Sequence, residues 1–156
     1  MSAAPQSSNQ ISSNERLLAT IPHFSFFLAM LLSYGILDGL LGIHNNFILN
    51  TVALLICPVS CFIIFFVNHG RSQFVAFHSL QAAIFHSILI SRVVFIMFVF
   101  RDSLDDAGAM LPAMILMPFM CLWPLLALLG GISSFNRKDF KYPIIGEWAK
   151  SMVLHI

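Results

Sequence analysis

Four long apolar blocks separated by short polar segments set the pattern of this chain. The blocks cover about residues 17–37, 47–67, 74–100 and 109–132. Each has close to the ~20 residues that an α-helix needs to cross a bilayer core. The connections between them are short, so successive helices are expected to run antiparallel and to pack together. The pattern predicts an all-α, polytopic membrane protein whose domain, residues 17–135, is a four-transmembrane-helix bundle.

Polar segments flank this bundle on both sides. Residues 1–16 are rich in Ser and Asn and lack an apolar stretch, so we expect a disordered polar tail rather than a signal peptide. Residues 136–156 begin as a basic juxtamembrane loop and continue as a mixed apolar and charged stretch that is too short to span a bilayer. We expect a short amphipathic helix at the membrane interface there. The expected interface anchors are Tyr142, Trp148, Lys138 and Lys141.

The third block carries polar side chains at membrane depth, where they are costly unless they face protein or water. On a helix that turns about 100° per residue, His78, Gln81 and Arg92 fall on one stripe. One interpretation is a helix interface, in which His78 and Gln81 hold the bundle together while Arg92 extends to the far membrane surface. The alternative is a polar pathway for ions, protons or a peptide.

Composition and charge support a membrane protein and orient it. The chain is 58% hydrophobic and only 10% charged, with a mean hydropathy of +0.87, whereas soluble domains are about 25% charged. No basic patch accompanies a nucleic-acid-reading motif, so nucleic-acid binding is excluded. The positive-inside rule places both termini on the cytoplasmic side or its organellar equivalent. The residues that decide this are Arg16, Arg71, Arg137, Lys138, Lys141 and Lys150.

Signals for catalysis, metals or cofactors are weak. The chain has no nucleophile elbow, P-loop, dinucleotide-binding turn or zinc-protease motif, so we expect neither an enzyme nor a cofactor. Cys57 and Cys61 are best explained as small packing residues. A haem between His23 and His78 is the remaining cofactor alternative, because both lie near the same ends of their helices. The loop acids, interpreted as an ordinary solvated loop, are Asp102, Asp105 and Asp106.

Three segments resemble a known family: ERLLATIPHFSFFLAMLL, RSQFVAFHSLQAAIFH and FKYPIIGEWAKSM. They are similar to the twenty-kilodalton subunit of the chloroplast inner-envelope protein translocon and its bacterial four-helix relatives. The resemblance covers about residues 15–152. The residues that match the family motifs are Phe77, His78, Gln81 and Ala82 in the third block, and Tyr142, Pro143, Ile144 and Ile145 after the fourth.

This resemblance implies an integral membrane subunit of a protein-import translocon, which gives a translocation or scaffolding surface in the bilayer. The alternative function is a small accessory subunit that stabilises a larger respiratory or photosynthetic complex. The expected partners are other membrane-protein subunits, lipids and a translocating polypeptide. The expected location is the plastid inner envelope, another organelle inner membrane or a bacterial inner membrane.

Overall fold

The computed structural model describes residues 11–32, 39, 47–99, 110–138 and 140–155. These residues form five helices, and the prediction of an all-α protein is confirmed. The first and last connections of the predicted bundle, residues 38–46 and 101–108, lie almost wholly outside the described residues. The helices are α1 (Ser13–Met30), α2 (Phe47–Asn68), α3 (Gln73–Val99), α4 (Met110–Phe135) and α5 (Ile145–His155).

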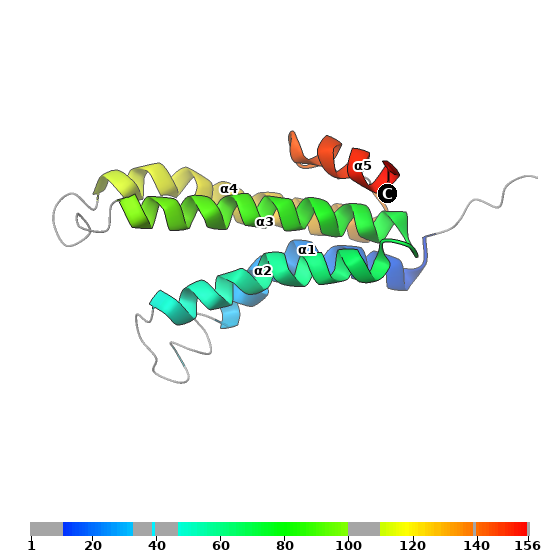
Figure 1. Ribbon diagram of the computed structural model, residues 1–156, viewed down its shortest axis with the longest axis horizontal. Helices are drawn as coiled ribbons and strands as arrows, with labels where there is room; N and C mark the ends of the chain where they lie inside the picture. Colours follow the sequence, from blue (N-terminus) through cyan, green and yellow to red (C-terminus); the bar gives the residue numbers. More distant parts are fainter. Residues whose placement is uncertain (1–10, 33–38, 40–46, 100–109, 139, 156) are drawn as a thin grey trace, which may run out of the picture.

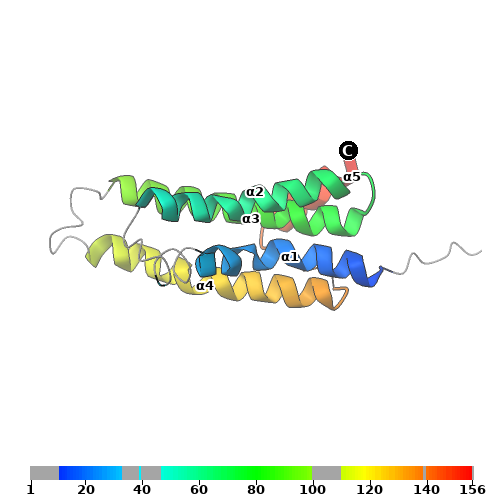
Figure 2. The ribbon, with the colours of Figure 1, turned by 90° about the horizontal axis from the view of Figure 1, so that it is seen from below.

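Helices α1 to α4 form an elongated bundle of two layers. Figure 1 shows α1 and α2 below α3 and α4, and the view in Figure 2 shows that α2 pairs with α3 while α1 pairs with α4. The start of α1, the turn between α2 and α3, the end of α4 and the short helix α5 all lie at the same end (Figure 1). The basic residues of these segments are therefore gathered at one end of the bundle, which we call the basic end.

Helix α1 begins inside the segment that was expected to be a disordered tail. The backbone N–H of Glu15 donates to Ser12 Oγ at 3.2 Å, and the Ser12 N–H donates to Glu15 Oε2 at 2.8 Å. This capping box satisfies two of the N–H groups that a helix start leaves free. The boundary predicted at residue 16 is therefore too late, because the cap fixes the first helical residue at Ser13.

The chain reverses sharply after α4 and again before α5. At the end of α4, the Lys138 N–H donates to the Ser133 carbonyl at 2.8 Å, and Arg137 takes a positive φ of 61°. This is the Schellman motif that commonly ends a helix. Before α5, the Ile145 N–H donates to the Pro143 carbonyl at 2.8 Å across Ile144, whose φ is 68°. That turn is a γ-turn of the strained, positive-φ form.

Helix α5 docks along the side of α3 rather than across the end of the bundle (Figure 1). Its Ala149 and Val153 are buried in a cluster of apolar side chains from α2 and α3. The neighbouring turn is tight, since a Cβ on Gly146 would meet the Lys141 Cβ at 2.6 Å. The other face of α5 exposes Trp148. The amphipathic helix is thus present where the sequence indicated one, and its contacts fix it to α3.

The outer surface of the bundle is apolar while part of its interior is polar. Fully buried side chains include histidine, glutamine and serine. Among the described residues, one stretch, Gln73–Phe95, is long and apolar enough to cross a membrane by length and composition. Large apolar side chains with more than half of their surface exposed include Leu28, Leu31, Val59, Ile63, Phe66, Phe95, Phe98, Met114, Leu122 and Leu125.

Candidate functional site

The candidate site is a buried polar cluster at the level of His78, in the half of the bundle nearest the basic end. His23 from α1 lies between two partners: its Nδ1 is 2.8 Å from the Tyr142 hydroxyl, and its Nε2 is 3.3 Å from His78 Nδ1. All three side chains are at most 1% exposed. The cluster therefore joins α1, α3 and the segment that follows α4.

His78 Nδ1 is the meeting point of this cluster. Besides His23, it lies 3.2 Å from Gln81 Nε2 and 3.0 Å from Ser134 Oγ of α4. The Ser134 hydroxyl donates to the Gly130 carbonyl at 2.7 Å, one turn earlier in α4. Side chains from three of the four long helices therefore converge on one ring nitrogen.

Hydrogen-bond directions are fixed for Gln81 but not for the two histidines. The Gln81 amide nitrogen donates to the Phe140 carbonyl at 2.8 Å and has a second N–H on the side of His78 Nδ1. A ring nitrogen carries either one proton or one lone pair. His78 Nδ1 can therefore accept from Gln81 or His23, or donate to Ser134 Oγ. The direction of the contacts from Tyr142 through His23 follows from that tautomer.

The chain of hydrogen bonds from Tyr142 through His23 ends at His78. Among the described residues, His78 Nε2 is buried and has no hydrogen-bond partner. The rings of Phe74 and Phe77 lie beside His78, with centroids 4.6 Å and 5.0 Å from its own. The cluster therefore closes against aromatic rings, and it does not continue toward Arg92.

Gln81 satisfies an irregular backbone segment that enters the bundle. Its Nε2 donates to the Phe140 carbonyl, and its Oε1 accepts from the Tyr142 N–H at 3.4 Å. Non-helical backbone at membrane depth is tolerated where protein buries it and supplies partners. The Tyr142 ring also stacks on Phe85 at a centroid distance of 4.2 Å and an interplanar angle of 9°. Gln81 and Phe85 thus position Tyr142 against His23.

Two glycines in α4 allow α1 and α4 to approach closely at the cluster. A Cβ added to Gly130 would lie 2.7 Å from His23 Nδ1 and 3.0 Å from the Tyr142 hydroxyl. A Cβ on Gly131 would lie 2.6 Å from the Phe24 ring. Small residues at helix contacts let membrane helices approach closely. Gly130 is therefore part of the site, because a larger residue would overlap His23, and Gly131 gives the same close approach beside Phe24.

A second polar contact lies deeper in the bundle, around His86. Trp123 Nε1 donates to His86 Nδ1 at 3.0 Å, and His86 Nε2 lies 3.1 Å from the Pro22 carbonyl. An indole N–H can only donate and a carbonyl can only accept, so the tautomer with the proton on Nε2 is fixed. Trp123 also stacks on Phe26 at 4.3 Å. His86 thereby links α3 to both α1 and α4.

Pro22 and the two buried cysteines complete the α1–α2 contact. The Pro22 carbonyl accepts from Ser25 Oγ at 2.7 Å and from Cys61 Sγ at 3.5 Å. Cys57 Sγ donates to the Ser25 carbonyl at 3.5 Å. The thiols are therefore small packing residues, as expected from their position in an apolar block, and they also bridge two helices.

The predicted polar stripe divides into two environments. The structure brings His78 and Gln81 together in the cluster, whereas Arg92 is exposed near the other end of α3. Tyr142 was expected as an interface anchor, but it is 1% exposed and lies inside the bundle. That interpretation is corrected, because its hydroxyl, its ring and its backbone all have buried partners. Lys138 is exposed at the basic end, as is Trp148 on α5, and Lys141 pairs with Glu147 there at 2.6 Å.

Neither a metal nor a haem fits the cluster as it stands. The described residues contain no group of three His, Cys, Asp or Glu side chains arranged to hold a metal ion. His23 and His78 face each other, but their nitrogens are 3.3 Å apart. This hydrogen-bond distance leaves no space for an iron and its macrocycle between the rings. The haem alternative is therefore not compatible with this packing.

Sequence reasoning missed two contributors to the cluster and the second polar contact. Ser134 and Tyr142 come from segments distant in sequence, and His86, the centre of the second contact, lies off the predicted stripe of α3. The Gly130–Gly131 pair was a usable signal, since paired glycines in an apolar helix indicate a close approach. The position of His23 and His78 near the same ends of their two helices was a second signal. No local pattern pointed to Tyr142 as the partner of His23.

Comparison with known proteins identifies the family. A family model described as the magnetosome magnetite crystal formation protein family, MamF/MmsF, matches residues 14–149. No curated protein and no solved structure matches the chain. The matched range contains all five cluster residues named above around His78 and Tyr142. It also covers most of the described helices.

The resemblance to a chloroplast translocon is therefore wrong, and with it the expectations of protein transport and a plastid location. The alternative of an accessory subunit in a respiratory or photosynthetic complex is not supported either. The short motifs gave a wrong family because they contain His78, Gln81 and Tyr142. These residues occupy buried positions where a helix bundle needs polar side chains that bond to one another. The protein is membrane-associated, and it belongs to the MamF/MmsF magnetosome magnetite crystal formation protein family.

Proposed function

We propose that this protein is a four-helix integral membrane protein that acts in magnetite crystal formation at the membrane of the compartment in which the crystal grows. The family match supports the process, since it covers residues 14–149. The distribution of polar and apolar side chains supports the membrane arrangement. This distribution of side chains is the observation on which the proposal depends.

The bundle has the polarity expected of a protein surrounded by lipid. His23, His78 and Gln81 are fully buried, whereas Phe66 and Phe98 are more than 70% exposed. Soluble monomers rarely expose large continuous apolar surface, and polar side chains in membrane helices face the protein interior. Helices α1 to α4 would then be the four spans. Other membrane proteins and lipids would be the partners on the outer surface.

The basic end would face the cytoplasm. The residues that support this orientation lie at the start of α1, in the turn before α3 and after α4, together with Lys150 of α5. By the positive-inside rule both termini are then cytoplasmic. The opposite end of the bundle then faces the compartment. Residues 101–108 follow α3 in the sequence and lie outside the described residues. In sequence this segment contains Asp102, Asp105 and Asp106.

Carboxylates on the compartment side would be the groups that meet the growing mineral. Oxygen ligands of this kind suit hard metal cations. The buried cluster has a different role in this proposal: it fixes α1, α3 and α4 relative to one another and catalyses no reaction. Every ring nitrogen and hydroxyl of the chain from Tyr142 through His23 to His78, apart from His78 Nε2, already has a protein partner.

Three measurements test this function. The protein should stay in the membrane pellet after alkaline carbonate extraction, and a C-terminal fluorescent fusion should report a cytoplasmic terminus. In a magnetite-forming bacterium, deletion should change crystal size and the wild-type chain should restore it. Extraction by carbonate, or unchanged crystals after deletion, would contradict the proposal.

The acidic segment can be tested in the same bacterium. A triple Asp→Asn variant at positions 102, 105 and 106 should reach normal protein levels and fail to restore crystal size. Asp38→Asn is the matched control, because it removes one acid from the same predicted side outside this segment. Equal rescue by both variants would show that the three carboxylates do not contact the mineral.

A further inference from the structure

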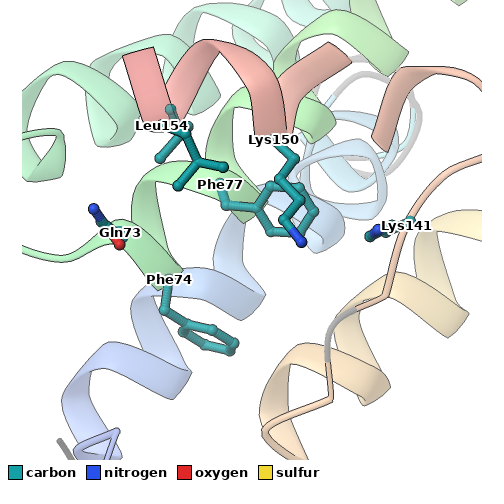
Figure 3. A pocket seen from close by; sticks show the side chains of 7 residues that line it. Gln73, Phe74, Phe77, Lys141, Lys150 and Leu154 are labelled. Atoms are coloured by element: carbon teal, nitrogen blue, oxygen red, sulfur yellow. The ribbon is translucent and has the colours of Figure 1, made fainter. Parts of the chain in front are cut away.

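A groove between α3 and α5 at the basic end has the lining of a lipid site. It encloses about 240 Å³ and is bounded by the first turns of α3, by α5 and by the segment before α5. Figure 3 shows Lys150 extending from α5 past Phe77, with Lys141 of the segment before α5 beyond its amino end and Phe74 farther away across the groove. The lining residues are Gln73, Phe74, Phe77, Lys141, Lys150, Val153 and Leu154.

We propose that this groove binds an anionic phospholipid, with its phosphate between Lys141 and Lys150 and the start of one acyl chain on Phe74 and Phe77. The inference depends on the membrane arrangement proposed above.

The two kinds of lining match the two parts of a phospholipid. The lysine side chains supply positive charge, while Phe74, Phe77, Val153 and Leu154 supply an apolar surface. Basic residues on the cytoplasmic side of membrane proteins attract anionic lipid headgroups. A free anion would use the lysines and leave the aromatic and aliphatic lining in contact with water. The combination therefore fits an amphipathic anion better than a simple one.

The size of the groove fits a headgroup and the beginning of a chain. One water needs about 10–15 Å³ of cavity space, so the groove, at about 240 Å³, has room for much more than a single small ion. An adjoining cavity of about 260 Å³ shares Gln73 and Val153 with the groove and is lined further by residues of the α2–α3 turn, including Arg71. The headgroup can extend into this polar cavity, while the remaining lipid lies along the apolar outer surface.

The groove also lies at the level where the headgroup of a membrane lipid is expected. It opens beside the first residues of α3, where the third predicted span begins, and the exposed Trp148 lies on the adjacent helix α5. Trp side chains favour the headgroup level of a bilayer. The strained turn at Ile144 and the close contact at Gly146 set the angle at which α5 leaves the bundle. These local constraints hold Lys141 and Lys150 at one groove.

Glu147 competes with the proposed ligand. It accepts a hydrogen bond from Lys141 Nζ at 2.6 Å and is itself exposed. A phosphate in the groove would have to share Lys141 with this carboxylate. Removal of the Glu147 charge should therefore strengthen lipid binding, whereas removal of a lysine charge should weaken it. Effects of opposite sign on the same groove distinguish a defined site from general attraction to the basic end.

The test is native mass spectrometry of the purified full-length protein with phosphatidylglycerol or phosphatidylcholine of identical chains. The wild type should retain phosphatidylglycerol preferentially, Lys150→Gln should bind it about fivefold more weakly, and Glu147→Gln should bind it more tightly. Lys138→Gln is the matched control, since it removes a charge from the same end outside the groove. Lys150→Arg should retain binding.

Three outcomes would overturn the inference: equal retention of both lipids, equal weakening by Lys138→Gln and Lys150→Gln, or displacement of the lipid by glycerol phosphate alone at matched concentration. The last outcome would show a simple anion site. Carbonate extraction of each variant separates this test from the proposed function. A protein that stays in the membrane without selecting phosphatidylglycerol refutes only the lipid site, whereas a wild type released by carbonate refutes the membrane arrangement.

Discussion

The first and last turns of α3 belong to one continuous helix but have different surroundings. Every residue from Val75 to Ala83 is buried, whereas the described side chains from Ser91 to Val99 are half-buried or exposed. Near the basic end, α3 is covered by α5 and by the segment that carries Tyr142, in addition to α1 and α2. Burial of a polar side chain on α3 therefore depends on its depth in the bundle as much as on its helical face.

This difference explains why one predicted stripe gave two outcomes. His78 and Gln81 lie in the covered part and form hydrogen bonds within the protein, while Arg92 lies in the open part. His86 is about 80° from the stripe, yet it is buried because α1 and α4 contact that side of the helix. The angular position of a residue on the helix therefore does not by itself predict whether its side chain is buried.

The largest effect is expected from Gln81→Leu in the covered part. The substitution leaves the Phe140 carbonyl and the Tyr142 N–H buried without their partner. Each lost partner costs about 1–3 kcal/mol, so the free energy of unfolding in mixed micelles should fall by about 3 kcal/mol. Ser91→Leu in the open part is the control and should change it by less than about 0.5 kcal/mol. Similar losses of unfolding free energy in both variants would contradict the difference between the covered and the open part of α3.

A somewhat smaller effect is expected from Gly130→Ala. The new methyl group would have to lie 2.7 Å from His23 Nδ1, so α1 and α4 must separate. Overpacking of this kind costs about 1–3 kcal/mol. Gly70→Ala is the matched control at the same end, because nothing lies within 4 Å of its added Cβ. Denaturant titration of the two variants gives the measurement, and a tolerated Gly130→Ala would show that the contact adjusts freely.

The sequence predicted the four long helices and the amphipathic segment because apolar length and spacing are local properties. It also paired His78 with Gln81, since residues three apart share a helix face. Tyr142 could not be placed in this way. An aromatic residue after the last span is typical of an interface anchor, and its partner His23 is 119 residues away. Only the packing of four helices brings the two together.

Tyr142→Phe should have a modest effect. It removes the hydroxyl 2.8 Å from His23 and keeps the ring that stacks on Phe85. Hydrogen bonds inside membrane proteins contribute about 1 kcal/mol or less, so the free energy of unfolding should fall by about that amount. Tyr142→Leu should cost more, because it also loses the stacking. Equal costs for the two variants would mean that the hydroxyl carries the whole contribution.

The smallest effect is expected at the exposed pair on the rim of α5. The hydrogen bond and the charge of Lys141 lower the pKa of Glu147 from its ordinary value of 4.5. A carboxylate with a lowered pKa stabilises the folded state above its unfolded pKa, and this contribution is lost as the pH falls through the folded pKa. The Tm advantage of the wild type over Glu147→Gln should therefore be present near neutral pH and vanish in acid. A Tm advantage that persists in acid would show that a group other than the Glu147 carboxylate provides it.

The bond between residues 23 and 142 has a consequence for the order in which the bundle is completed. The first helix leaves the ribosome early, but the hydroxyl that fixes His23 belongs to a segment made after all four long helices. Until that segment folds back against Gln81, α1 lacks one of its two buried partners at this level. The segment after α4 therefore completes the hydrogen bonding of the first helix, and a protein shortened before Tyr142 would leave His23 with His78 but without the hydroxyl on its other ring nitrogen.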